Sequence, residues 1–344
     1  MGSHPFPVRE IAREAGVSTA TVDRVLNDRG GVRSTTVARV RRALAELERR
    51  QEAFELGGRT FTIDLVMQAP RRFTTAAWDA FDEVVPAAQP AAFRLRPHLA
   101  ERVDPDEVVA TLDAIAERGS HAVVLKAPDT ESVRAAVDRL ADGGIPVITI
   151  VTDLPASRRL AYVGLDNRAA GATAAYLIRQ WWPAGGPATV LLTISSERFQ
   201  GEGARAEGFR EAAARLGPAW RIEQLSETEG LADVIDVELD ELAARTTIDA
   251  VYSIGGGNPA VLDVLARHGQ RPSVYVAHDL DRDNRRLLSS GDLSAVLHHD
   301  LTTDAARVLR LVMQAHGAVP GRAATEPAPV HVVTPYNIPS PARH

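Results

Sequence analysis

The stretch VREIAREAGVSTATVDRVLN, residues 8–27, constrains the fold most, because its pattern fits two short helices joined by a tight turn. In its first half, apolar residues such as Ile11 and Ala15 recur about one helical turn apart and leave arginines and glutamates outside. Gly16 can adopt the left-handed conformation that ends a helix, and Ser18 can cap the next helix. The sequence therefore predicts a helix, a turn over residues 15–18 and a second helix.

The second predicted helix, TATVDRVLN, buries its valines and leucine and presents short side chains beside one arginine, Arg24. Short side chains let a helix approach DNA closely, and an arginine fork can pair with guanine in the major groove. A third helix, TTVARVRRALAELE, is expected after Ser34, a possible cap. Three such helices can close a minimal core, although any charged helical trio would give the same periodicity.

Some forty contiguous residues, V-REIA-REAGVS-TATVDRVLN-DRGGVRSTTVARVRRALAEL, resemble the N-terminal headpiece of the LacI/GalR family of transcription regulators. The resemblance implies that bases are read by Thr19, Ala20 and Arg24. It implies phosphate contacts at Thr21, Asn27, Arg33 and Thr36. Asp23 stands where the family usually has serine. Because a carboxylate repels phosphate, we expect that contact to be absent or redirected to a neighbouring arginine.

Length and composition indicate an ordinary globular chain of two or three domains, with 344 residues and 45% hydrophobic content. No apolar run reaches membrane-spanning length, and the N-terminus lacks the regions of a secretory signal, so we expect a cytoplasmic protein that does not contact the membrane. The absence of cysteine excludes disulfides and thiolate metal sites. The initial MGSH has the character of a tag remnant and is left out of the fold prediction.

The charge is unevenly distributed, although the net charge is −6. Residues 1–60 contain 11 arginines against 8 acidic residues, whereas the remainder contains 28 basic against 37 acidic residues. A basic head on an acidic body is compatible with docking into a DNA groove, with modest nonspecific affinity. Lys126 is the only lysine, a bias typical of a GC-rich genome.

A polar stretch, ERRQEAFELGGRT, follows the predicted third helix and has the composition of a helix tail and then a linker. It lacks the Tyr-x-Pro-Asn turn that precedes the hinge helix of the resembled family, and Glu52 and Glu55 would be repelled by phosphates. We therefore expect a helix-turn-helix headpiece over residues 5–48 and a linker over residues 49–60.

From Phe61 onward, strands alternate with helices, which predicts parallel sheets of βαβ units. Two successive sets are present, and they suit two lobes. The segments YVGLDNRAAG, RAEGF, SIGGGN and VYVAHDL resemble the family's effector domain, which is similar to periplasmic sugar-binding proteins (type I). That resemblance implies a cleft between the lobes of an effector-binding and dimerisation domain over residues 61–340. Lobe 1 is expected over about 61–162 and 292–323, and lobe 2 over about 163–291 and 324–340.

Residues just past the strands are the candidate ligand contacts, because ligands of open α/β sheets bind at the carboxyl ends of the strands. This rule and the family positions select Gln68, Arg72, Phe73, Asp129, Asp166, Phe199, Arg205, Asn258, Asp279 and His299. Carboxylates that accept paired hydroxyls, with an aromatic against an apolar ring face, favour a sugar, a polyol or a sugar derivative. Lys126, Asp153 and Asp300 also follow strands.

Several candidates have a structural alternative. Asp166 and Asp129 can each cap a helix, and Arg205 can form a structural salt bridge instead of contacting ligand. Many relatives carry another arginine two residues before Arg205, where this chain has Gly203. Arg71 with Arg72 could compensate for it by binding a carboxylate or phosphate. Asp279, at a strand end and at a family ligand position, is the best single candidate.

A rival hypothesis comes from GGGNPA, residues 255–260, which satisfies the dinucleotide-binding pattern G-x-G-x-x-A after a strand. It would make the chain an NAD-dependent dehydrogenase, but the motif lies late and leaves little room for a catalytic domain. Two of the histidines that could suggest a metal, His298 and His299, are adjacent on a strand and would face opposite ways. A periplasmic solute-binding protein fits the second half alone, but not the headpiece.

The sequence thus predicts a non-enzymatic regulator without cofactor or metal, in which a small effector controls binding to double-stranded, pseudo-palindromic operator DNA. One headpiece covers too few base pairs for useful specificity, so we expect a homodimer.

Overall fold

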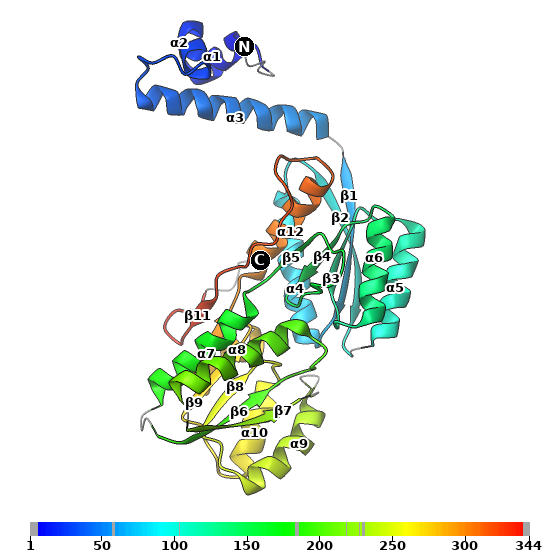
Figure 1. Ribbon diagram of the computed structural model, residues 1–344, viewed down its shortest axis with the longest axis vertical. Helices are drawn as coiled ribbons and strands as arrows, with labels where there is room; N and C mark the ends of the chain where they lie inside the picture. The colour runs from blue at the N-terminus through cyan, green and yellow to red at the C-terminus, as the bar shows by residue number, and fades with distance from the viewer. Residues whose placement is uncertain are drawn as a thin grey trace.

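The computed structural model describes residues 6–56, 59–102, 104–182, 186–217, 219–226, 228 and 231–339, and for residues 48–56 it describes the backbone only. Three parts follow each other along the long axis: a small helical headpiece and two α/β lobes (Figure 1). Among the described residues, no helix combines the length and the apolar character that crossing a bilayer requires.

The headpiece consists of α1 (Val8–Ala15), α2 (Thr19–Leu26) and α3 (Ser34–Leu56). Its core is a small apolar cluster around Ile11, Val22 and Val40, which are fully buried. The predicted turn is confirmed: Gly16 has φ +59°, and Ser18 Oγ accepts a hydrogen bond from Thr21 N at 3.2 Å.

The third helix differs from the prediction at both ends. It begins at Ser34 itself, so Ser34 is the first helical residue and not its cap. It also continues through residues 49–56, which covers most of the predicted linker, and Gly57 and Gly58 lie outside the described residues. The headpiece is therefore extended toward lobe 1 by a single helix of 23 residues (Figure 1).

Lobe 1 is built on a parallel sheet of five strands in the order β2-β1-β3-β4-β5. They are β1 (Thr60–Gln68), β2 (Ala92–Ala100), β3 (Ala122–Lys126), β4 (Val147–Ile150) and β5 (Ala161–Val163). Helices α5 (Pro105–Arg118) and α6 (Glu131–Asp142) cover one face. The other face is covered by α4 (Arg71–Val84), which the 3₁₀ turn η1 (Val85–Ala87) follows, and by α12 (Leu301–Ala315).

Lobe 2 contains a sheet of six strands in the order β11-β10-β9-β8-β6-β7. The strands are β6 (Ala188–Thr193), β7 (Trp220–Leu225), β8 (Ala250–Ser253), β9 (Val274–His278), β10 (Ala295–His298) and β11 (His331–Val333). Only β11 pairs antiparallel among these described strands. Helices α7 (Asn167–Trp181) and α8 (Gln200–Leu216) cover one face. The other face is covered by α9 (Ala232–Arg245), α10 (Asn258–Arg267) and α11 (Arg282–Ser290).

One sequence-derived lobe boundary is wrong. Strand β10 pairs with β9 of lobe 2, whereas residues 292–323 were all expected in lobe 1. The chain thus crosses to lobe 1 only after His298. Of the helices and strands in residues 292–323, only α12 packs on the sheet of lobe 1. Strand order could not be deduced from the sequence, because a buried strand has the same apolar pattern in either sheet.

Candidate functional site

A cavity that is partly open to solvent lies between the two lobes, at the carboxyl ends of their strands. Its lining comes from both lobes and comprises Ala69, Pro70, Arg72, Phe73, Lys126, Val151, Thr152, Ser195, Phe199, Glu202, Arg205, Ile254, Gly255, Gly256, His278, Asp279 and Asp281. The position agrees with the rule that open α/β sheets bind ligands at this edge.

Half of the sequence-predicted ligand residues lie together at this cavity: Arg72, Phe73, Phe199, Arg205 and Asp279. The other half, Gln68, Asp129, Asp166, Asn258 and His299, do not line it. Each of these five side chains has a polar partner within the protein. Their positions at strand ends therefore stabilise local structure or hold a neighbouring side chain.

The helix-capping alternative holds for Asp166, which accepts a hydrogen bond from Ala169 N at 2.9 Å and faces solvent. Asp129 instead pairs with Arg134 at 2.5 Å, and the cap of α6 is Thr130. These carboxylates are therefore satisfied without a ligand.

Two buried amides among the candidates are also satisfied internally. Gln68 exchanges two hydrogen bonds with the backbone of Asp104, at 2.8 and 2.9 Å. Asn258 donates to Asn284 Oδ1 at 2.6 Å and accepts from the Tyr275 hydroxyl at 2.8 Å.

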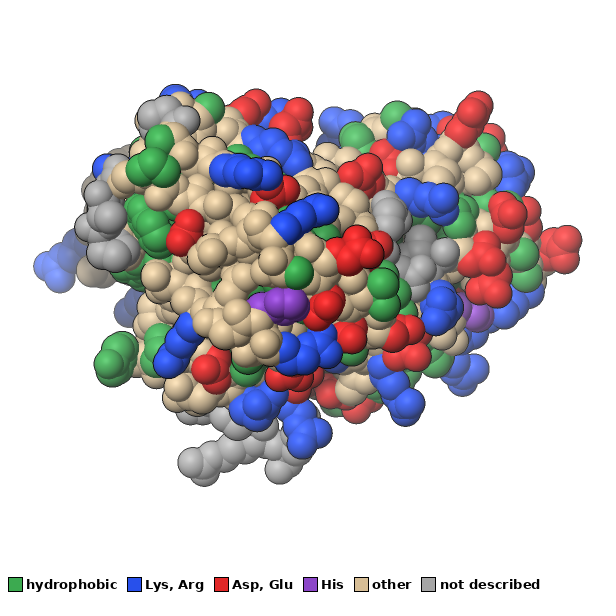
Figure 2. Space-filling model, turned by 90° about the horizontal axis from the view of Figure 1, so that it is seen from below, with side chains coloured by type: hydrophobic (Ala, Val, Ile, Leu, Met, Phe, Trp, Pro, Cys, Tyr) green, Lys and Arg blue, Asp and Glu red, His purple; other side chains and the backbone are tan. Residues whose placement is uncertain are grey.

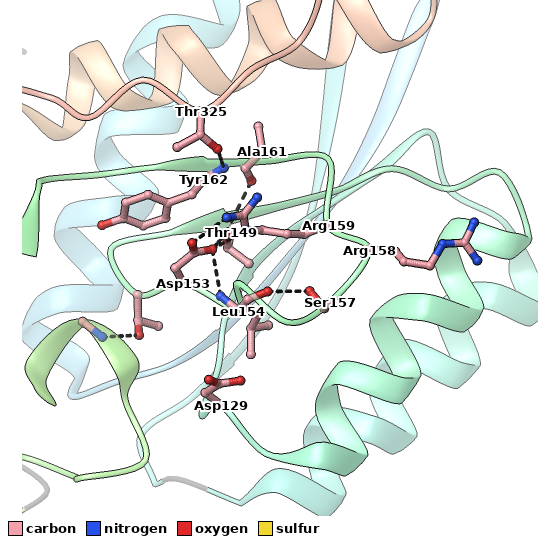
Figure 3. A network of polar contacts seen from close by, with 12 residues as sticks. Asp129, Thr149, Asp153, Leu154, Ser157, Arg158, Arg159, Ala161, Tyr162 and Thr325 are labelled. Atoms are coloured by element: carbon pink, nitrogen blue, oxygen red, sulfur yellow. Dashed lines mark hydrogen bonds and ion pairs between the residues drawn. The ribbon is translucent and has the colours of Figure 1, made fainter. Parts of the chain in front are cut away.

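Asp153 shows how a strand-end carboxylate can hold a loop together (Figure 3). It accepts hydrogen bonds from the Thr149 hydroxyl and Leu154 N, both at 2.8 Å, and forms an ion pair with Arg159. Nearby, Tyr162 N donates to Thr325 Oγ1, which connects β5 to the segment between α12 and β11.

Asp279 lies at the cavity in an unusual backbone conformation, with φ +63°. Its amide donates to Leu297 O, and its carbonyl accepts from Asn284 Nδ2. The left-handed region is costly for most residues but tolerated by Asp and Asn. These contacts therefore hold the backbone of Asp279 at the edge of the cavity.

Behind Asp279 is His299, which the sequence placed among the ligand contacts. Its Nδ1 lies 2.5 Å from Asp304 Oδ2, and its Nε2 lies 3.7 Å from Asp279 Oδ1. His299 thus supports the cavity wall through Asp279 and does not line the cavity.

Arg205 is almost fully buried, with 3% of its surface exposed, and its Nε donates to Asn167 Oδ1 at 2.8 Å. Among the described residues it forms no salt bridge, so the structural ion pair considered from the sequence is not found. Its charge is therefore available to the cavity.

Arg72 is not free to bind an anion in the way the sequence allowed. Its Nε lies 3.3 Å from Asp281 Oδ2, and its Nη2 donates to Gly255 O at 3.3 Å. Burial raises the pKa of Asp281, and Arg72 opposes that shift. Arg72 thus joins lobe 1 to lobe 2 beside the cavity.

Sequence reasoning noted Lys126 but did not include it in the predicted site, and it missed Glu202 and His278. Lys126 is buried at the end of β3, and burial lowers its pKa to about 8, opposed by Glu202 and Asp279. Glu202 accepts hydrogen bonds from Ser195 N and Ser195 Oγ, at 2.7 and 2.5 Å. His278 contacts the Tyr252 hydroxyl at 2.7 Å, and burial holds its pKa well below the usual range. The strand-end rule pointed to Lys126 and could have found His278, but Glu202 lies inside a helix.

The glycines of the GGGNPA motif have structural reasons in this fold. A Cβ on Gly255 would lie 2.2 Å from Ser195 N, and one on Gly256 would lie 2.3 Å from Arg72 Nη2. Gly257, the second glycine of the pattern, has φ +75° at the start of α10, so the fold accounts for the glycines without a dinucleotide. Within the described part of the chain, no three His, Asp or Glu side chains form a group that could hold a metal ion.

Most of the predicted DNA contacts are exposed on the headpiece. Thr19, Ala20, Arg24, Asn27 and Arg33 are exposed, and Thr21 and Thr36 are half-buried. Thr21 also shares a 2.9 Å hydrogen bond with the Ser18 hydroxyl, which helps to fix the start of α2. On the face away from the headpiece, acidic and basic side chains are interspersed (Figure 2).

Asp23 organises its neighbours on α2. It forms an ion pair with Arg29 at 2.9 Å and accepts a hydrogen bond from Asn27 Nδ2 at 2.9 Å. The carboxylate of Asp23 therefore binds two side chains that could otherwise contact phosphate.

A helix-turn-helix headpiece on a two-lobed α/β fold with an interlobe cavity defines the class of ligand-controlled DNA-binding proteins. Residues 66–317 match the model of the periplasmic binding protein domain, and residues 8–49 match that of the bacterial regulatory proteins of the lacI family. The chain belongs to the LacI family of transcription regulators, with a periplasmic-binding-protein-like domain.

Solved structures of similar fold include GanP, a glucose-galactose binding protein from Geobacillus stearothermophilus (20% identity, 82% of this chain and 99% of that chain, TM-score 0.72). A solute-binding protein from Burkholderia graminis C4D1M, in complex with D-arabinose, is 19% identical over 83% and 98% of the chains, with TM-score 0.71. One from Actinobacillus succinogenes 130z with bound D-allose is 14% identical over 80% and 98%, with TM-score 0.69. A search of curated protein sequences gave no match.

Proposed function

We propose that this regulator is a homodimeric, cytoplasmic repressor whose operator binding is controlled by a small neutral sugar or polyol in the interlobe cavity. One observation carries the proposal: an exposed helix-turn-helix surface and an interlobe cavity that charged side chains of both lobes line are joined in one chain. The cavity gives a ligand contacts in both lobes, so binding can shift their relative position and with it the headpiece.

The charges at the cavity support a neutral ligand. Arg72 and Asp281 pair with each other, which leaves two cations, Lys126 and Arg205, against Glu202 and Asp279. A sugar hydroxyl can donate to a carboxylate while it accepts from an ammonium or guanidinium group. Phe73 and Phe199 also line the cavity and add apolar surface beside Lys126, whose Nζ lies 5.6 and 3.8 Å from their ring centroids. The proteins of similar fold named above bind or hold aldoses.

Thermal shift against a panel of sugars, polyols, sugar acids and sugar phosphates tests the effector class. A ligand at 100 times its Kd should stabilise the fold by about 2.7 kcal/mol. Stabilisation by neutral members is the expected result. Stabilisation by acids and phosphates alone would contradict the assigned charge balance, and no stabilisation by any of them would contradict a sugar-like effector.

Selection from a random double-stranded library tests the DNA-binding surface, and the selected operator should contain two inverted half-sites. On it, Arg24→Ala should cost about 1 to 3 kcal/mol and relax preference at one base pair of each half-site. Arg33→Ala is the comparison, because loss of a phosphate contact should weaken all sequences alike and flatten the salt dependence. Equal losses on operator and random DNA for Arg24→Ala would contradict its base-reading role.

Sedimentation tests the oligomeric state, since a monomer at micromolar concentration would contradict a dimer that binds two half-sites. A reporter gene downstream of the selected operator tests the direction of regulation. Repression that is relieved by the ligand from the thermal shift is the expected outcome, whereas activation would contradict the repressor role.

A further inference from the structure

Lys126 is the only lysine in the chain, and it lies in the interlobe cavity and not on the surface. Elsewhere the chain uses arginine for every cation, on helices, loops and the headpiece alike. Arginine stays protonated, whereas a buried lysine can lose its proton and act as a nucleophile. A chemical role for the free amine therefore gives a physical reason for lysine at this position.

Lys126 lines the cavity and is buried, and its ammonium group has no ion-pair partner among the described residues. It donates to Gln68 O at 3.2 Å and lies 3.8 Å from the ring centroid of Phe199. Among the described residues, no carboxylate oxygen lies within 4.0 Å of it. The charged groups that act on it from farther away are Glu202, Asp279 and Arg205.

We propose that Lys126 Nζ condenses reversibly with the open-chain aldehyde of the effector, which makes the effector an aldose or another small aldehyde. The proposal rests on the proposed function, because the effector must bind in this cavity. An arginine, or a polyol in place of the aldose, could not form this bond.

The step is balanced without an oxidant or reductant. The neutral amine adds to the carbonyl carbon, and one amine proton moves to the carbonyl oxygen, which becomes a hydroxyl group. The hydroxyl then takes up a proton from solvent and leaves as water while the nitrogen lone pair forms the C=N bond, which gives the protonated imine. Hydrolysis with one water reverses the reaction and releases the aldehyde.

Two features of the cavity favour this reaction. Because burial lowers the pKa of Lys126 to about 8, roughly a tenth of the amine is neutral at pH 7, far more than for an exposed lysine. The carboxylates of Glu202 and Asp279 line the same cavity and would stabilise the protonated imine.

Reductive trapping tests the proposal directly. The protein is incubated with glyceraldehyde and cyanoborohydride at pH 7.5, and the rate of labelling at Lys126 is measured by peptide mapping. Only Lys126 and the N-terminal amine can react, so the N-terminal amine serves as an internal reference. The matched control is the same lysine in protein unfolded by guanidinium, and Lys126→Arg should lose the label altogether.

We expect labelling at Lys126 to be at least tenfold faster in the folded than in the unfolded protein, after normalisation to the N-terminal amine. Equal or slower labelling would overturn the proposal. A parallel thermal shift with D-arabinose and its alditol separates the two hypotheses. If both compounds stabilise the protein but labelling at Lys126 is not faster, the imine is refuted and the sugar-like effector is still supported. If no member of the sugar panel stabilises the protein, the proposed function is refuted.

Discussion

Arg72 on α4 of lobe 1 and Asp281 at the start of α11 of lobe 2 form an ion pair, with Nε and Oδ2 3.3 Å apart. The guanidinium also donates to Gly255 O of lobe 2, and Gly256 leaves it room. All four residues line the cavity. The pair therefore connects the relative position of the lobes to the shape of the ligand site.

The first prediction concerns this connection. Asp281→Asn should favour a more open arrangement of the lobes, with a larger radius of gyration by small-angle scattering and weaker effector binding. Because both side chains are partly exposed, the loss should be about 1 kcal/mol or less. Asn is the suitable replacement because Asp281 also caps α11 through Asn284 N. Arg71→Ala, which removes the charge of the exposed neighbouring arginine, is the control. If Asp281→Asn changes the radius of gyration and effector binding no more than Arg71→Ala does, the role of the pair is refuted.

The second prediction uses the pKa of Lys126, which falls from its ordinary value of 10.5 to about 8 in the folded state. Below pH 8 the lysine is charged in both states, and the folded state bears the cost of burying the charge. Above pH 10.5 it is neutral in both states, and the cost is gone. Lys126→Met should therefore stabilise the protein by up to about 3 kcal/mol at pH 7 and by much less at pH 10.5.

Denaturant titrations of both proteins between pH 7 and pH 10.5 measure this difference. No other lysine titrates in this range, so the change can be assigned to one residue. A difference that does not depend on pH would mean that packing, not charge burial, determines the effect.

The third prediction concerns Asp23, whose carboxylate holds Arg29 and Asn27. Asp23→Asn should free Arg29 for phosphate and tighten binding to operator and random DNA alike. The slope of log K against log salt should become steeper by about 1. Asp28→Asn, a neighbouring exposed carboxylate, removes the same charge without freeing Arg29. Equal effects of the two substitutions would show that only net charge matters.

Much of the fold could be predicted from the sequence because the signals are local. The turn at Gly16, the cap at Ser18 and the alternation of strands and helices each depend on neighbouring residues. The lobe to which β10 belongs depends on strand pairing across the sheet, and the sequence-derived boundary was wrong there.

The candidate site was predictable only in part, because a strand end places a residue near the cavity but does not fix its partners. Asp279 and Asp129 both follow strands, yet one lines the cavity and the other pairs with Arg134. Glu202 was missed because it lies in the first turn of α8, and the approach of α8 to lobe 1, where Gly201 N donates to Thr152 Oγ1, is a tertiary contact.

The fourth prediction links the cavity to DNA binding. Asp279→Asn should abolish the influence of the effector on operator binding and leave operator affinity without effector nearly unchanged. Asn tolerates the φ of +63° at this position, whereas Ala would add backbone strain to the loss of the carboxylate. Operator titrations with and without the ligand measure the coupling. A normal response to the effector in Asp279→Asn would show that the proposed site is wrong.

The fifth prediction concerns α3, which continues as a helix to Leu56 and so extends from the headpiece core toward lobe 1. If the helix transmits the orientation of the headpiece, deletion of one residue from 51–55 should rotate the headpiece by about 100° and shift it by about 1.5 Å. Deletion of four residues should shorten the helix by about 6 Å but leave a net rotation of only about 40°. In a library of operators with varied half-site spacing, the single deletion should therefore disturb spacing preference and affinity more than the fourfold deletion. Unchanged spacing preference in both variants would refute coupling through a rigid α3, while the ligand site could still be correct.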